Sequence, residues 1–176
     1  MPSSRPGVRR VLLALIVLSA LVLSIQRLRS WLASEPTRIR WRLEEMVEGF
    51  NETRLGPCLR GLAEDWRDAG GEVDRALLAD YLRSLFFNER DPESGRFPYR
   101  AELEPEALEI ELDGEREDRA RVVAVVGFST LAGGEWSPTW RVRVRAELEK
   151  HPRLGWQARR SEHETLESDG RLVRSR

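Results

Sequence analysis

The sequence has few of the residues on which many common functions depend. Its 176 residues include one cysteine, Cys58, and two histidines. One cysteine cannot form an intramolecular disulfide or build a cysteine-rich zinc site. No HExxH, CxxC, GxGxxG, GxxxxGK[ST] or GxSxG motif occurs in the chain. We therefore expect no metal and no other cofactor, and the motifs identify no reaction.

Neither sign of charge dominates the chain. It holds 29 basic and 30 acidic residues, which gives a formal net charge of −1 at pH 7. A domain that binds the phosphate backbone usually carries a marked excess of basic residues. We therefore predict that the protein does not bind nucleic acid.

Acidic residues are missing from the first 30 positions, which hold five arginines. Residues 11–25 (VLLALIVLSALVLSI) carry no charge, and as a helix they would be about 22 Å long against a hydrocarbon core of about 30 Å. Flanking arginines can snorkel outward, so a single span is feasible. No face of this run is polar, which argues against a buried core helix.

The N-terminal pattern predicts a basic tail over residues 1–10 and a membrane anchor over residues 11–30. The alternative is a secretory signal that is cleaved, with Ser24 as one possible position. The arginines are nearly balanced on the two sides of the apolar run, so the positive-inside rule gives no clear orientation. A basic tail before an apolar run is typical of an export signal. We predict a single-pass protein of a bacterial inner membrane, held through residues 11–25 with its C-terminal domain outside the cytoplasm, or alternatively a secreted protein.

Three segments after the anchor have apolar residues at helical spacing. In residues 39–50 and 55–66 these residues recur at offsets of 4, 7, 8 and 11, and a third apolar stripe covers residues 73–86. Ser34 is a suitable N-cap for the first segment. The second helix is expected to begin near Pro57 and to end at Gly70.

The period changes to two after residue 97, which indicates strands. Alternation is clear in residues 108–113 and 140–149, whereas residues 121–131 are apolar on both faces, as in a central strand. Residues 156–166 can form a last strand, and residues 97–103 a short edge strand. Helices that are segregated from a mostly antiparallel sheet make an α+β domain.

The order of these elements resembles the nuclear transport factor 2-like superfamily, which includes SnoaL-like and ketosteroid-isomerase-like proteins. The resemblance rests on the successive segments IRWRLEEMVEGF, LAEDWRD, VDRALLADYLRSLFF, EALEIELDGEREDRARVVAVVGF, WRVRVRAELEK and LGWQARRSE. It implies three N-terminal helices packed on a curved, mostly antiparallel sheet of about four strands, shaped like a cone. This domain would cover residues 34–167, with a disordered tail over residues 168–176. The chain is also similar to bacterial members that carry the domain behind an N-terminal anchor or export signal.

The superfamily contains both enzymes and binding modules, so the resemblance does not decide the function. Its enzymes include isomerases, dehydratases and polyketide cyclases, which need an acid or base inside an apolar cone. The candidates in this chain are Asp65, Asp80, Tyr81, His151 and His163. Both aspartates and His151 are expected at solvated positions, and Tyr81 at the rim of the core. His163 follows the inward Trp156 by seven residues, so it should point outward unless a bulge intervenes. No catalytic residue is assigned.

An apolar pocket is the other candidate site. The side chains expected to face it are those of Phe50, Tyr81, Phe86, Trp140 and Trp156, which would hold a small apolar ligand or else simply fill the core. Cys58 is expected to be a small packed residue.

Arg141, Arg143 and Arg145 lie on one face of a predicted strand. We expect them to pair with acidic residues of neighbouring strands, among them Glu109, Glu111 and Glu162; the alternative is contact with phosphates or lipid headgroups. The same face is a possible surface for a protein partner or a homodimer.

These observations predict a membrane-tethered, non-catalytic domain that binds a protein partner or a small apolar ligand outside the cytoplasm. The alternative is a lyase or isomerase that acts on a small hydrophobic substrate in the cone.

Overall fold

The structure, a computed structural model, describes residues 33–91 and 94–168. The chain divides into two compact units, Met1–Arg38 and Ile39–Arg176. The predicted tail over residues 1–10 and the anchor over residues 11–30 lie outside the described residues, as do residues 169–176 of the predicted C-terminal tail. No helix within the described ranges has the length and apolar character that a membrane crossing requires.

Two of the three predicted helices are confirmed. Helix α2 (Glu35–Asn51) begins after Ser34, whose Oγ accepts a hydrogen bond from the backbone N–H of Thr37 (3.4 Å). Helix α4 (Arg75–Asn88) begins after Asp74, whose carboxylate accepts from the N–H of Leu77 (2.8 Å). Both residues satisfy backbone donors that have no partner within the helix.

The prediction of a second helix that continues to Gly70 is wrong beyond Arg60. Helix α3 (Leu55–Arg60) is short, and strand β1 (Leu62–Asp68) follows it directly. The backbone of β1 pairs in parallel with β6 (Gly155–Ser168), and the pairing has an irregular register. That irregularity lets Leu62, Ala63 and Trp66 all be buried, so a strand reproduces the spacing of a helical stripe. Pairing with a distant strand overrides the local pattern, and the three helices are therefore not consecutive.

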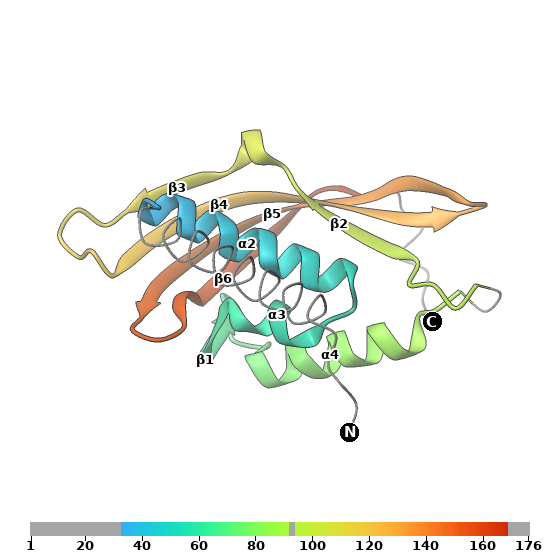
Figure 1. The fold of residues 1–176 in the computed structure, drawn as a ribbon, viewed down its shortest axis with the longest axis horizontal. Helices are drawn as coiled ribbons and strands as arrows, with labels where there is room; N and C mark the ends of the chain where they lie inside the picture. The colour runs from blue at the N-terminus through green and yellow to red at the C-terminus, as the bar shows by residue number, and fades with distance from the viewer. Residues whose placement is uncertain (1–32, 92–93, 169–176) are drawn as a thin grey trace, which may run out of the picture. The chain divides into compact units, whose positions relative to one another are not determined.

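A curved sheet of six strands forms the other layer (Figure 1). Its order is β1-β6-β5-β4-β2, and β3 also pairs with β4. The remaining strands are β2 (Tyr99–Leu103), β3 (Glu109–Leu112), β4 (Arg119–Ala132) and β5 (Glu135–His151). All pairs except β1–β6 are antiparallel. The prediction of about four strands omitted β1, and the predicted short edge strand is confirmed as β2.

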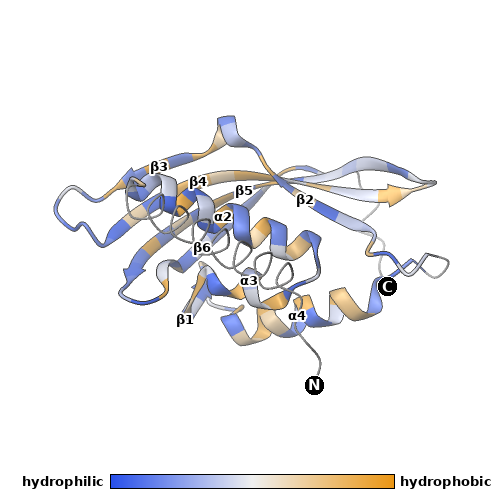
Figure 2. Ribbon diagram, in the orientation of Figure 1, coloured by the Kyte–Doolittle hydropathy of each residue, from blue (hydrophilic) through white to orange (hydrophobic). Residues whose placement is uncertain are grey.

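The hydrophobic core lies between this sheet and the helices. Ile39 of α2 is completely buried and packs with Leu62, Trp66, Leu148 and Trp156. Figure 2 shows that α4 is also largely hydrophobic along its length. Helix α4 packs mainly against α3 and β1, at one side of the sheet.

The opposite face of the sheet carries a ladder of ion pairs. Arg141 binds both carboxylate oxygens of Glu104, at 2.8 Å each, and lowers the pKa of that carboxyl group. Arg143 pairs with Glu164, and Arg145 with Glu162. The prediction of cross-strand pairing is confirmed, but the described partners of the three arginines lie on β6 and just after β2, and do not include Glu109 or Glu111.

Candidate apolar ligand site

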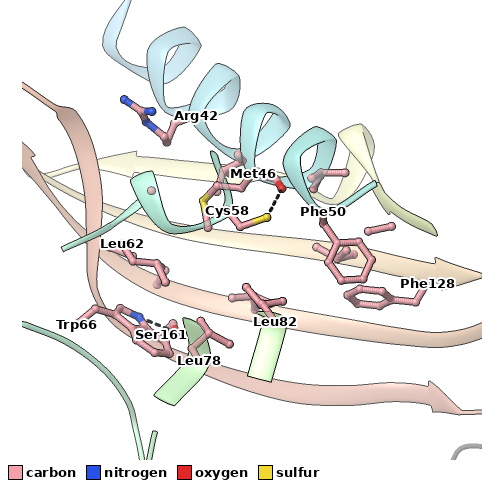
Figure 3. Close-up of a pocket in the computed structure, with 18 of the residues that line it drawn as sticks. Arg42, Met46, Phe50, Cys58, Leu62, Trp66, Leu78, Leu82, Phe128 and Ser161 are labelled. Atoms are coloured by element: carbon pink, nitrogen blue, oxygen red, sulfur yellow. Dashed lines mark hydrogen bonds between the residues drawn. The ribbon is translucent and has the colours of Figure 1, made fainter. Parts of the chain in front are cut away.

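A cavity of about 610 Å³ lies between the helices and the inner face of the sheet (Figure 3). Its wall combines residues of α2, α3, β1, α4, β2, β4, β5 and β6. Most of the lining side chains are apolar: Leu43, Met46, Val47, Phe50, Leu62, Leu78, Leu82, Leu85, Val126, Phe128, Val144 and Leu148. No aspartate, glutamate or histidine is among the described residues that line it. The space between the helices and the sheet is therefore hollow and mostly apolar.

Aromatic rings close one end of the cavity. The ring of Phe50 lies edge-on to those of Phe86, Phe97 and Phe128, with centroids 5.8, 5.5 and 5.7 Å away. Phe128 stacks on Trp140 at 5.2 Å. Such edge and stacked contacts stabilise aromatic clusters beyond the area that they bury. This end offers flat apolar surfaces to a ligand.

Helices α2 and α3 meet at a second part of the wall, where Cys58 lies. The thiol donates a hydrogen bond to the carbonyl of Arg54 (3.3 Å) and is buried with the rest of the side chain. Burial raises its pKa to about 11. Cys58 is packed, as predicted, and its thiol is protonated near neutral pH and therefore a poor nucleophile.

The single described arginine of the lining is already engaged. Arg42 donates to the carboxylate of Glu45 and to the backbone carbonyl of Leu154, both at 2.6 Å. These bonds fasten α2 to the turn between β5 and β6. The Glu45 carboxylate also compensates the positive charge of Arg42, so the cavity presents no free cation at this point to an anionic ligand.

Further polar groups reach the lining. Thr139 donates to the carbonyl of Phe128 (3.2 Å), and the indole N–H of Trp66 donates to Ser161 Oγ (3.2 Å). Burial, and then the neighbouring Glu89 carboxylate, raises the pKa of Tyr99. All of these groups are neutral, so the cavity favours an uncharged ligand.

The structure separates the five residues that the sequence grouped into one pocket. Phe50 and Trp140 line the cavity. Phe86 is buried behind Phe50, and Trp156 lies in the core cluster around Ile39. Tyr81 is 58% exposed, because Leu78, Leu82 and Leu85 form the face of α4 that turns inward. Binding of a ligand by Phe50 and Trp140 stays a prediction.

The two aspartates and His151 are exposed, as expected. Asp65, which lies on β1 instead of at a helix end, pairs with Arg159 (2.7 Å), and Asp80 pairs with Arg83. The Nδ1 atom of His151 accepts the backbone N–H groups of Arg153 and Leu154 in a turn. Groups of three or more metal-ligating side chains are absent from the described residues.

His163 lies on the opposite face from the one expected of a regular strand. The pairing with β5 shifts between Leu148↔Ala158 and Glu147↔Arg160, which adds one residue on β6. This bulge reverses the faces beyond it. His163 therefore pairs with Val144, whose side chain lines the cavity, and lies exposed on the cavity side of the sheet.

The bulge also explains why Ser161 was missed. Regular alternation from Trp156 places residue 161 outside, but Ser161 pairs with Ala146 and lines the cavity. In the sequence, the adjacent charged residues Arg159 and Arg160 interrupt the alternation of apolar and polar residues along this strand. That interruption is the one sequence signal of the bulge.

Comparisons with known proteins find similarity of structure alone. No family model matches the sequence, and no curated protein does. A solved nuclear transport factor 2-like protein with a cystatin-like fold, from Novosphingobium aromaticivorans, superimposes with a TM-score of 0.58 at 17% identity, covering 89% of this chain and 95% of that one. The domain has the nuclear transport factor 2-like fold. The resemblance stated from the sequence is confirmed at the level of the fold.

Two further structures with this fold carry enzyme names. A candidate scytalone dehydratase from N. aromaticivorans gives a TM-score of 0.56 at 15% identity, covering 73% of this chain and 82% of that one. A ketosteroid isomerase-like protein from Erwinia carotovora atroseptica gives a TM-score of 0.52 at 16% identity, covering 76% of this chain and 98% of that one. At such identities the nuclear transport factor 2-like fold is shared, and an activity does not follow.

Proposed function

We propose that the domain binds a small, uncharged, apolar molecule in its cavity and acts as a binding module. The observation that carries this proposal is a hollow of about 610 Å³ with an almost wholly apolar wall. Ligand sites commonly have this size and character, with a few polar groups that orient the bound molecule. A protein partner or a second copy of the chain at the outer face of the sheet is the alternative occupant, but the described arginines of that face already pair within the sheet.

The N-terminal segment would tether this binding domain to a membrane. The charge-free run over residues 11–25 supports the proposal. A tethered domain would take up apolar molecules close to the bilayer, where they partition.

The proposal is tested with N-phenyl-1-naphthylamine, a neutral probe whose fluorescence rises in apolar surroundings. The full chain in lipid nanodiscs should bind the probe above the signal of empty nanodiscs. Ala146→Phe adds a ring to the cavity wall and should weaken binding at least tenfold. Arg145→Phe is the matched control, because it places the same ring on the opposite face of β5 and should leave binding unchanged. Equal binding by both variants would refute the proposal.

A lyase or isomerase is the second candidate function. It is favoured by His163, which the bulge brings to the cavity side of β6 next to Ser161. A histidine on the cavity side of the sheet can move a proton to or from a hydrophobic substrate. Conversion of a β,γ-unsaturated cyclic ketone to its conjugated isomer would be lost in His163→Gln, whereas probe binding would be kept. Absence of any turnover by the wild-type chain would count against this candidate.

A further inference from the structure

A hydroxyl group whose hydrogen has no described acceptor lies in the wall of the largely apolar cavity. Ser161 Oγ accepts the indole N–H of Trp66 at 3.2 Å, and Trp66 is 6% exposed. In the part of the chain that the structure describes, no acceptor receives the hydrogen of this hydroxyl. Ser161 is half-buried, and a polar hydrogen that is partly withdrawn from water without a partner costs free energy, so a ligand that offers an acceptor gains free energy there.

The position of Ser161 is fixed by the backbone on both sides. Its carbonyl accepts the N–H of Ala69 (2.8 Å), and it pairs with Asp68 on β1 and Ala146 on β5. Ala146 lines the cavity, and directly paired residues of antiparallel strands share a face. The hydroxyl is therefore held on the cavity side by two neighbouring strands.

Trp66 prepares Ser161 to act as a donor. The indole N–H occupies one lone pair of the oxygen, which leaves the O–H free to turn toward another acceptor. Hydrogen bonds in a chain polarise one another, so a hydroxyl that accepts from Trp66 donates more strongly. The low polarity of the surrounding wall increases this effect.

The other side-chain donors of the wall are engaged elsewhere. Thr139 donates to the carbonyl of Phe128, and the Cys58 thiol donates to that of Arg54. Arg42 binds Glu45 and Leu154, and the Trp140 indole donates to Thr165. Ser161 is thus the group that best fits the role of ligand donor.

We propose that Ser161 donates a hydrogen bond to a neutral oxygen acceptor, such as a carbonyl group, of the molecule bound in the cavity. This inference rests on the proposed function and defines its ligand class. The ligand is an uncharged apolar molecule with an acceptor oxygen at the end near Trp66. Figure 3 shows Ser161 and Trp66 at one end of the cavity, and Phe50 and Phe128 at the other, where the apolar or aromatic part of the ligand would lie.

The test compares fluorenone with fluorene, which share one tricyclic frame and differ in the carbonyl oxygen. Both are titrated calorimetrically into the full chain in lipid nanodiscs, with empty nanodiscs as the blank. Ser161→Ala should weaken fluorenone binding about tenfold, close to the loss of one neutral hydrogen bond, and should change fluorene binding less than twofold. Ser129→Ala is the control, because it removes the same hydroxyl from a residue of β4 that does not line the cavity; fluorenone binding should stay within twofold.

A spectroscopic measurement on the unaltered chain removes the dependence on a variant that folds poorly. The infrared carbonyl stretch of bound fluorenone should shift to lower frequency than in cyclohexane, and Ser161→Thr, which keeps the hydroxyl, should preserve the shift. An unshifted band, or equal losses of both probes in Ser161→Ala, would overturn the role of Ser161 and leave ligand binding intact. If neither probe binds the wild-type cavity, the proposed function fails with it.

Discussion

Cys58 provides a chemical reporter at the scale of one residue. Its thiol is buried against the carbonyl of Arg54, and burial raises its pKa to about 11 from the ordinary value of 9.0. The reactive thiolate is therefore scarce at pH 8, and a thiol-modifying reagent has little access to the buried sulfur. We expect Ellman's reagent to modify Cys58 at least a hundredfold more slowly in the native chain than in guanidinium chloride.

The same thiol has a consequence for stability at alkaline pH. The folded state holds this proton more tightly than the unfolded state, so the contribution to stability is full below pH 9 and falls as the pH rises toward about 11. Cys58→Ala should flatten this part of the pH profile of the free energy of unfolding. Fast native labelling at pH 8, or an unchanged alkaline slope in the variant, would contradict the buried, protonated thiol.

The side chains of the site were predictable only where the strand or helix pattern is regular. Phe50 belongs to the inward stripe of α2, and Trp140 to the regular alternation of β5, and both line the cavity. Ser161 and His163 lie beyond a bulge, which depends on pairing with β5 and which alternation alone does not reveal. Tyr81 belongs to a stripe wider than the surface that α4 turns inward, so periodicity alone could not exclude it.

The crossing of α2 and α3 depends on the absence of a side chain at Gly49. A Cβ atom there would lie 2.7 Å from the Pro57 Cβ and 3.1 Å from the backbone nitrogen of Cys58. We expect Gly49→Ala to reduce the free energy of unfolding by about 1–2 kcal/mol, because overpacking exceeds the gain in helix propensity.

Gly56 in α3 is the matched control for this element. A Cβ atom at Gly56 would have no neighbour within 4 Å, and this residue does not need a positive φ. Gly56→Ala should therefore be neutral, or stabilising by up to about 1 kcal/mol. Thermal unfolding of the two variants measures the difference. A Gly49→Ala variant as stable as Gly56→Ala would mean that the two helices do not cross so closely.

Strand β1 is an element whose secondary structure is set by distant pairing and not by its local sequence pattern. Its apolar residues have helical spacing, and α3 even begins within the predicted range. Yet Ala158 donates its N–H to the carbonyl of Gly61, and the parallel register with β6 continues to Asp68. These bonds join residues nearly a hundred positions apart. Nothing within the LAEDWRD segment itself reveals them, whereas α2 and α4 carry their own capping residues.

At the scale of the described domain, the order of periodic segments was enough to recognise the fold, but not the hollow. The cavity exists because α4 packs mainly on α3 and β1, and stands away from the central strands β4 and β5 (Figure 1). That separation is set by tertiary contacts and cannot be derived from a list of apolar residues. A filled core and a pocket therefore have the same sequence pattern, and the structure distinguishes them.

The proposed tether is a property of the whole chain and is tested on the whole chain. Residues 1–30 hold five arginines and no acidic residue, and three of these arginines, Arg5, Arg9 and Arg10, precede the apolar run. A basic tail before an apolar run is typical of an export signal. A C-terminal alkaline phosphatase fusion, which is active only after export, should therefore be active in a bacterial host and remain in the membrane fraction after carbonate extraction.

The arginines before and after the apolar run allow a matched comparison. Changing Arg5, Arg9 and Arg10 to Asn leaves Arg27 and Arg29 as the dominant charges, so the orientation should invert and phosphatase activity should fall at least fivefold. Changing Arg27 and Arg29 to Asn should keep or raise the activity. An inactive parent fusion would place the domain in the cytoplasm. An active fusion released into the soluble periplasmic fraction would instead indicate a cleaved signal, and the cavity would then collect its ligand away from the bilayer.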